Sequence, residues 1–169
     1  MNLQDAIRQL TRNAEAIRAL AGAFSDEHAR WKPDADSWCM QEVLEHLYNE
    51  ERGDFRRHLK TAFGEPQAPC KYVRVDDPRQ ALEGLMAERA ASTAWLATLQ
   101  APDRAAPDWD TTIQLRFGPS EETATFSAGD MLISWVEHDV LHLRQLVELL
   151  HAWNERQADP YSVDYAGGW

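Results

Sequence analysis

Two histidines, His138 and His142, lie four residues apart in a segment with helical periodicity. Side chains at this spacing share one helix face, with Cβ atoms about 5–6 Å apart, so two imidazoles can bind one metal ion. His46, in an earlier segment, could supply a third imidazole if the two segments are neighbours. Three protein ligands with one open position is the pattern of a catalytic zinc site. These residues therefore predict a divalent-metal site.

Two polar residues accompany the histidines and are candidates for catalysis. Glu50 follows His46 by one helical turn. It could be a fourth ligand, an acceptor for an imidazole N–H, or a base for bound water. Gln145 follows His142 on the same face and could orient a bound water.

Other interpretations of these histidines stay open. Histidines on an apolar stripe are often hydrogen-bonded core residues, so the pair could be structural. The run HDVLH at 138–142 resembles the HExxH motif with aspartate in place of glutamate, and its first two residues resemble those of HD-type phosphohydrolases. The other features of both groups are not apparent in the chain. His28, His58 and His151 have no such neighbours and are interpreted as surface or loop residues.

Tryptophan is abundant, with seven in the chain. So much aromatic area is costly to leave in water, so several must be buried or line a cavity. Trp38, Trp135 and Trp169 could form the walls of an apolar pocket over the metal, where a cofactor or substrate binds. Plain core packing is the alternative for each of them.

Four segments have the apolar periodicity of long helices: 3–24, 40–61, 77–99 and 127–153. Asp77-Pro78 and Ser127 are typical helix starts. Arg89 interrupts the apolar row of the third segment, and its stem could follow the core edge with its head in water. The last segment carries a seam at steps of four and three, typical of a helix facing a bundle core: Met131, Trp135, His138, His142, Gln145 and Leu149.

These segments predict an all-α four-helix bundle that forms a single domain over residues 1–169. Residues 100–126 predict a long irregular or short β excursion between the third and fourth helices, with a turn at Gly118-Pro119. Residues 71–75 could be a short extended piece. The tail, 158–169, is not expected to be helical and, with the excursion, is a candidate lid.

Composition narrows the classes of partner. The formal net charge of −11 argues against nucleic acid and against an anionic membrane surface. No run of about 18 apolar residues is present, and the charged N-terminal stretch does not resemble a signal peptide. Cys39 and Cys70 form no CxxC motif and are expected to be reduced thiols. We therefore expect a soluble, cytoplasmic protein.

Three features together resemble the DinB/YfiT-like metalloenzyme family. A W-x-P loop at 31–33 is followed by the pair Ser37-Trp38 and by a helix with an early histidine, His46. The run 137–146 is similar to the family's late H-x-x-x-H motif followed by glutamine. Length and helix layout match over nearly the whole chain. Many members have His-Arg-Gly-Gln after the second histidine, whereas here Arg144 is displaced by one position, about 100° around the helix.

The resemblance implies an up-down-down-up bundle, a homodimer, and one divalent ion per chain, nickel or zinc, held by His46, His138 and His142. Family members with assigned activity use low-molecular-weight thiols, as bacillithiol or glutathione S-transferases and as a mycothiol-dependent maleylpyruvate isomerase. We therefore expect a metal-dependent enzyme that activates a thiol or water for transfer to, or hydrolysis of, a small-molecule substrate. The alternative is a non-catalytic metal- or ligand-binding bundle with a stress-response role.

Overall fold

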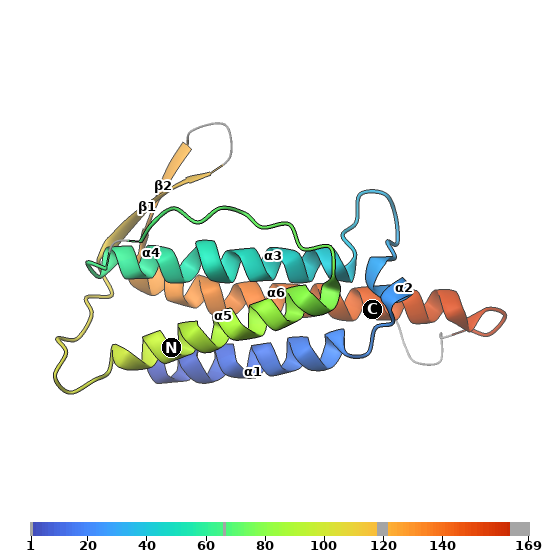
Figure 1. Ribbon diagram of the computed structural model, residues 1–169, viewed down its shortest axis with the longest axis horizontal. Helices are drawn as coiled ribbons and strands as arrows, with labels where there is room; N and C mark the ends of the chain where they lie inside the picture. The colour runs from blue at the N-terminus through green and yellow to red at the C-terminus, as the bar shows by residue number, and fades with distance from the viewer. Residues whose placement is uncertain (1, 66, 118–121, 163–169) are drawn as a thin grey trace.

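The computed structural model describes residues 2–65, 67–117 and 122–162. Long helices lie side by side along one axis (Figure 1). They are α1 (Leu3–Ala21), α3 (Met40–Gly53) with its continuation α4 (Phe55–Ala62), α5 (Pro78–Thr98) and α6 (Ala128–Ala158). A short helix, α2 (Asp26–Arg30), precedes α3. The predicted four-helix bundle is confirmed.

The helices follow an up-down-down-up order. In Figure 1, α1 and α6 run in one direction and α3 and α5 in the other. Helix α1 packs against α5 and α6, and α3 packs against α5. Because α3 and α5 are parallel neighbours, the connection between α4 and α5 must return along the length of the bundle, and Figure 1 shows it lying over α3.

The helix boundaries differ from prediction in several places. The predicted helix 40–61 is broken at Asp54, whose φ of −118° and ψ of −93° are not helical. Helix α1 ends at Ala21 rather than Phe24, and α6 continues to Ala158 rather than ending at Trp153. The predicted start of α6 is confirmed, because Ser127 and Asp130 form a reciprocal capping box there.

A β-hairpin fills the excursion before α6. Strands β1 (Thr112–Phe117) and β2 (Glu122–Ser127) pair antiparallel, and β2 leads directly into α6. The predicted turn at Gly118-Pro119 lies outside the described residues, as does the end of the tail from 163 onward, which includes Trp169.

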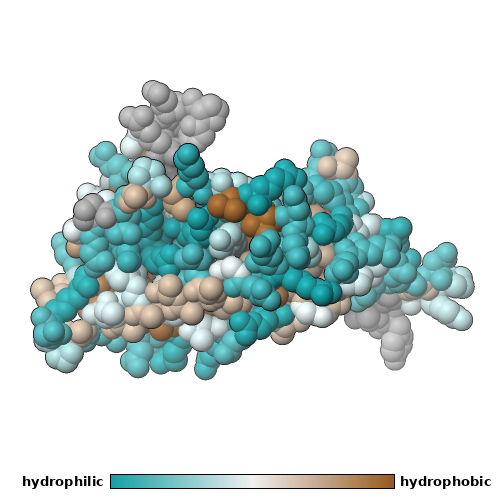
Figure 2. Space-filling view, in the orientation of Figure 1, coloured by the Kyte–Doolittle hydropathy of each residue, from teal (hydrophilic) through white to brown (hydrophobic). Residues whose placement is uncertain are grey.

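A polar layer divides the hydrophobic core into two clusters. One cluster, around Leu10 and Trp135, lies toward the hairpin; the other, around Leu44 and Leu146, lies toward α2. Each of the four long helices contributes one buried polar residue at the point where its sequence passes from one cluster to the other. These residues are Asn13 of α1, Glu51 of α3, Arg89 of α5 and Asp139 of α6. The outside of the molecule is mainly hydrophilic on the face shown in Figure 2, with small apolar patches above α3.

Two side chains predicted to face solvent are buried instead. Arg89 does not place its head in water: it is 4% exposed, because carboxylates from two other helices surround its guanidinium. His28 is not a surface residue: it is 3% exposed, because its ring stacks between Phe24 and Trp153 at centroid distances of 3.9 and 4.5 Å. Within the described residues, no helix combines the length and apolar character needed to cross a membrane.

Candidate metal centre

Three imidazoles converge between α3 and α6. Nε2 of His138 lies 3.2 Å from Nε2 of His46 and 3.2 Å from Nε2 of His142. In a tetrahedral zinc site with Zn–N bonds of about 2.0–2.1 Å, neighbouring ligand nitrogens are about 3.3 Å apart. Ligand atoms of all three residues lie within 4.8 Å of one another. The predicted trio therefore has both the donor chemistry and the spacing of a three-histidine metal site.

Neighbouring side chains orient two of these rings. Nδ1 of His142 lies 2.8 Å from Gln145 Oε1, which can only accept a hydrogen bond. This contact places the proton on Nδ1 and leaves the Nε2 lone pair for a metal. Nδ1 of His46 lies 4.0 Å from Glu50 Oε1. Gln145 thus contacts a ligand directly, and Glu50 lies beside another.

Burial keeps two of the candidate ligands, His46 and His138, neutral. Desolvation, followed by the charges of the neighbouring imidazoles, lowers the pKa of His46 to about 4. Desolvation and the charge of His142 likewise lower the pKa of His138 to about 4. A neutral imidazole is the form that binds a metal, so both rings are ready to coordinate at neutral pH.

Glu50 belongs to a cluster with Asp54 and His58, two residues that were not predicted to be part of the site. Burial, then a hydrogen bond to Asp54 and the charge of Asp54, raise the pKa of Glu50 to about 8. Burial acts in the same direction on Asp54, but hydrogen bonds from His58 and Glu50 outweigh it and lower the pKa of Asp54. The signal was present in the sequence, because His46, Glu50, Asp54 and His58 follow one another at steps of four. His58 thus lies on α4 beside Asp54 rather than alone.

The two predicted pocket tryptophans lie in different places. Trp38 is 41% exposed, and its ring lies parallel to that of His142 at 6.3 Å and edge-on to that of His46 at 5.1 Å. Trp135 is 1% exposed and packs in the core, where its Nε1 donates to Glu51 Oε2 at 3.0 Å. Trp38 is therefore beside the candidate ligands, whereas Trp135 is placed as a core residue.

Two cavities reach the histidines. The larger, about 590 Å³, is lined by Trp38, His142 and Gln145, together with Pro33, Asp36, Ser37, Glu148, Leu149 and Ala152. The smaller, about 240 Å³, is lined by His138, Glu50 and Asp54, together with Phe55, Leu115, Phe126, Met131 and Ser134. A small molecule could therefore approach the imidazoles through either cavity.

Asp139 does not belong to the candidate centre. It is buried, and both of its carboxylate oxygens accept hydrogen bonds from Arg89. This arrangement contradicts the HExxH-like and HD-like interpretations, which need that carboxylate at the metal or its water. Arg144 also lies elsewhere, in an exposed ion pair with Glu148 at 2.9 Å.

Comparisons with known proteins place the chain in a family and support its fold. The sequence model of the DinB superfamily matches residues 9–146. No curated protein matches the chain. Among solved structures, the fold is similar to that of YfiT from Bacillus subtilis, described as "a probable metal-dependent hydrolase with an unusual four-helix bundle topology". The two chains are 17% identical, with a TM-score of 0.67 over 90% of this chain and 87% of the other, a likeness that shows the fold.

Proposed function

The chain belongs to the DinB superfamily, and from this premise we propose that it is a metal-dependent enzyme acting on a small molecule. A divalent ion held by His46, His138 and His142 would activate a thiol or a water molecule for transfer or hydrolysis. The observation that carries the proposal is the convergence of the three Nε2 atoms beside a cavity of about 590 Å³. Nickel and zinc both accept imidazole ligands.

Each residue of the centre has a distinct part in the proposal. When bound, a divalent ion lowers the pKa of a coordinated thiol or water. Gln145 holds the proton on Nδ1 of His142. Glu50, protonated near neutrality and hydrogen-bonded to Asp54, can give or take a proton beside His46. The ring of Trp38 lies beside two of the imidazoles and forms part of the wall of the larger cavity, where it can contact a bound small molecule.

The alternative function is a non-catalytic metal- or ligand-binding bundle. A purely structural metal site is closed by four protein ligands, whereas this trio adjoins two cavities. Near pH 7 Glu50, with its pKa raised to about 8, and His46, with its pKa lowered to about 4, are both neutral, so their contact is not an ion pair that stabilises the fold. Both observations favour catalysis over storage or a structural role.

The first test is metal content, measured by ICP-MS on untagged protein. We expect about one divalent ion per chain in the wild type, and its loss in His138→Ala because one of three ligands is removed. His151→Ala, on the same helix but outside the trio, should keep the ion. Absence of stoichiometric metal from the wild type, even after incubation with nickel and zinc, would overturn the proposal.

The second test separates catalysis from binding, and thiol from water. Loaded wild-type protein is assayed with electrophilic and ester or amide substrates, each with and without a low-molecular-weight thiol. Turnover lost in His138→Ala supports an enzyme, and thiol dependence assigns transfer rather than hydrolysis. A metal-loaded protein with no turnover under any condition supports the non-catalytic bundle.

The family resemblance also leads us to propose a cytoplasmic homodimer. Cys39 and Cys70 are free thiols, which suits a reducing compartment. Three apolar side chains exposed on one face of α6, Ile133, Val140 and Leu141, offer a surface for a second copy.

A further inference from the structure

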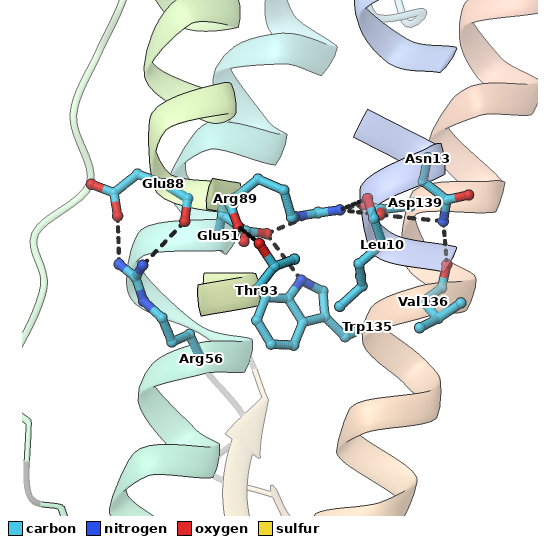
Figure 3. Close-up of polar contacts among 10 residues, drawn as sticks. All are labelled: Leu10, Asn13, Glu51, Arg56, Glu88, Arg89, Thr93, Trp135, Val136 and Asp139. Carbon is cyan, nitrogen blue, oxygen red and sulfur yellow. Dashed lines mark hydrogen bonds and ion pairs between the residues drawn. The ribbon is translucent and has the colours of Figure 1, made fainter. Parts of the chain in front are cut away.

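The polar layer in the core is organised around one side chain, Arg89 of α5 (Figure 3). Its Nη1 lies 2.6 Å from Asp139 Oδ2 and its Nη2 lies 2.8 Å from Asp139 Oδ1, a bidentate pair with α6. Nη2 also lies 2.9 Å from Glu51 Oε2 of α3. Burial alone would lower the pKa of Arg89, but these hydrogen bonds and charges outweigh it and raise that pKa. One guanidinium thus binds carboxylates from two other helices.

The same network reaches α1 and joins α3 to α6 a second time. Arg89 Nη1 donates to the carbonyl of Leu10 at 2.9 Å. Asn13 Nδ2 donates to Asp139 Oδ2 at 3.3 Å. Trp135 Nε1 of α6 donates to Glu51 Oε2 of α3 at 3.0 Å, and Figure 3 shows these side chains meeting between the helices. Hydrogen bonds and ion pairs therefore connect α1, α3, α5 and α6 at one level along the bundle.

This level coincides with the candidate metal centre. Asp139 directly follows His138 on α6, and Glu51 directly follows Glu50 on α3, within two turns of His46. Consecutive residues on a helix move as one rigid unit. A change in the separation of Glu51 and Asp139 therefore changes the separation of His46 and His138, whose Nε2 atoms are 3.2 Å apart.

We propose that Arg89 is a positioning residue for the metal centre: by holding Glu51 of α3 and Asp139 of α6, it sets the distance at which His46 meets His138 and His142. The inference depends on the proposed metal site. Direct packing between α3 and α6 is sparse compared with that of α3 on α5. The spacing of α3 and α6 therefore depends on the ion pairs that Arg89 makes with both helices. A buried ion triad generally adds little stability over apolar side chains of similar size, which leaves geometry as its contribution.

The test uses variants that separate geometry from stability. Arg89→Met alone would leave two buried carboxylates without a positive partner and would destabilise the fold. The main variant is therefore Glu51→Gln/Arg89→Met/Asp139→Asn, which removes all three charges together. Arg89→Lys keeps the charge but loses the planar fork that binds two carboxylates. The matched control is Arg56→Met/Glu88→Gln, which removes a partly buried ion pair between α4 and α5 that contacts none of the histidines.

Three measurements are made on each protein: the visible absorption spectrum after loading with Co²⁺, the Zn²⁺ dissociation constant by competition with a chromophoric chelator, and thermal unfolding of the metal-free form. The Co²⁺ spectrum reports the coordination geometry, which a merely stabilising residue would not change. We expect the triple variant to unfold cooperatively, with a changed Co²⁺ spectrum and Zn²⁺ affinity reduced on the order of tenfold. Arg89→Lys should show a smaller change of the same kind, and the control should match the wild type.

A folded triple variant with wild-type spectrum and affinity would overturn the inference. If the triple variant does not fold, Arg89→Lys decides: altered coordination supports the inference, and wild-type coordination rejects it. A wild type that binds neither Co²⁺ nor Zn²⁺ overturns the proposed function itself, and this inference with it. Failure of the two proposals is therefore distinguishable.

Discussion

The imidazole of His142 illustrates how a single side chain is prepared for coordination. Either ring nitrogen of a neutral histidine can carry the proton, and only the other can bind a metal. The contact of 2.8 Å between Nδ1 and Gln145 Oε1 selects the tautomer that leaves Nε2 free, toward His138. The ring of Trp38 lies parallel to the ring of His142, with the two centroids 6.3 Å apart.

Replacement of Gln145 should therefore weaken metal binding without removing a ligand. We expect Gln145→Leu to lower metal affinity about 10–100-fold, as is typical for loss of a partner that orients a ligand. Gln145→Glu keeps an acceptor at the same position and should bind at least as tightly as the wild type. Competition titration with a chromophoric chelator measures both; equal affinities for all three proteins would reject this role of Gln145.

At the scale of single residues, the sequence predicted those parts of the candidate site that depend only on residue spacing within one helix. The four-residue step of His138 and His142 on a core seam, and Gln145 one turn later, were visible without a structure. Arg89 and His28 were misplaced because their burial depends on partners from distant segments: carboxylates of α3 and α6 for one, the ring of Trp153 for the other. No local pattern reveals such partners.

At the scale of elements, the extended segment 71–76 has an unusual set of partners. It pairs with no strand among the described residues; side chains of α3, together with Arg30 of α2 at the carbonyl of Asp76, provide its backbone hydrogen bonds instead. Asn49 accepts from Val73 N at 2.8 Å and donates to Val73 O at 2.9 Å. Glu45 accepts from Val75 N at 2.8 Å. These α3 residues are one turn apart, so they match alternate residues of an extended chain.

Truncation of Asn49 should loosen this segment. Asn49→Ala removes both hydrogen bonds to Val73 and leaves its backbone unpaired against the helix, at a cost of about 1–3 kcal/mol in the free energy of unfolding. We expect faster hydrogen exchange across 71–76, measured by mass spectrometry, and a lower midpoint of chemical denaturation. Asn154→Ala, at an exposed site on α6, is the control. Unchanged exchange in Asn49→Ala would show that other contacts hold the segment.

Sequence periodicity predicted the long helices and the hairpin, but not every break. Asp54 interrupts the predicted second helix although the row His46, Glu50, Asp54 and His58 continues across it in register. The only local hint is the preceding Gly53, a weak helix former. The five-residue helix α2 was missed because it is too short to display a stripe.

At the scale of the whole molecule, the outer face of α6 carries exposed apolar side chains. Leu141 is 62% exposed, and Ile133 and Val140 lie on the same side of the helix. Helical stripes explain why four helices bundle, but not which neighbours they choose; the up-down-down-up order was implied by the family resemblance. The same resemblance implies the second copy for which this face is available.

Charge placed on that face should separate the copies. We expect Leu141→Glu to convert a dimeric wild type into monomers, because a carboxylate would be desolvated in the interface. Size-exclusion chromatography with light scattering measures the mass in solution. Gln157→Glu adds the same charge at an exposed site near the end of α6 and should leave the dimer intact. A dimer that persists in Leu141→Glu would place the interface elsewhere.

The network around Arg89 also has a consequence for how the chain reaches its fold. Its members come from α1, α3, α5 and α6, so the network is complete only when the first and last helices are both in place. These contacts join residues as many as 126 positions apart in the chain, so the network forms only after long loops have closed, and loop closure slows folding. During synthesis, a nascent chain that ends before α6 leaves Arg89 without Asp139, and the bundle can close only after the last helix leaves the ribosome.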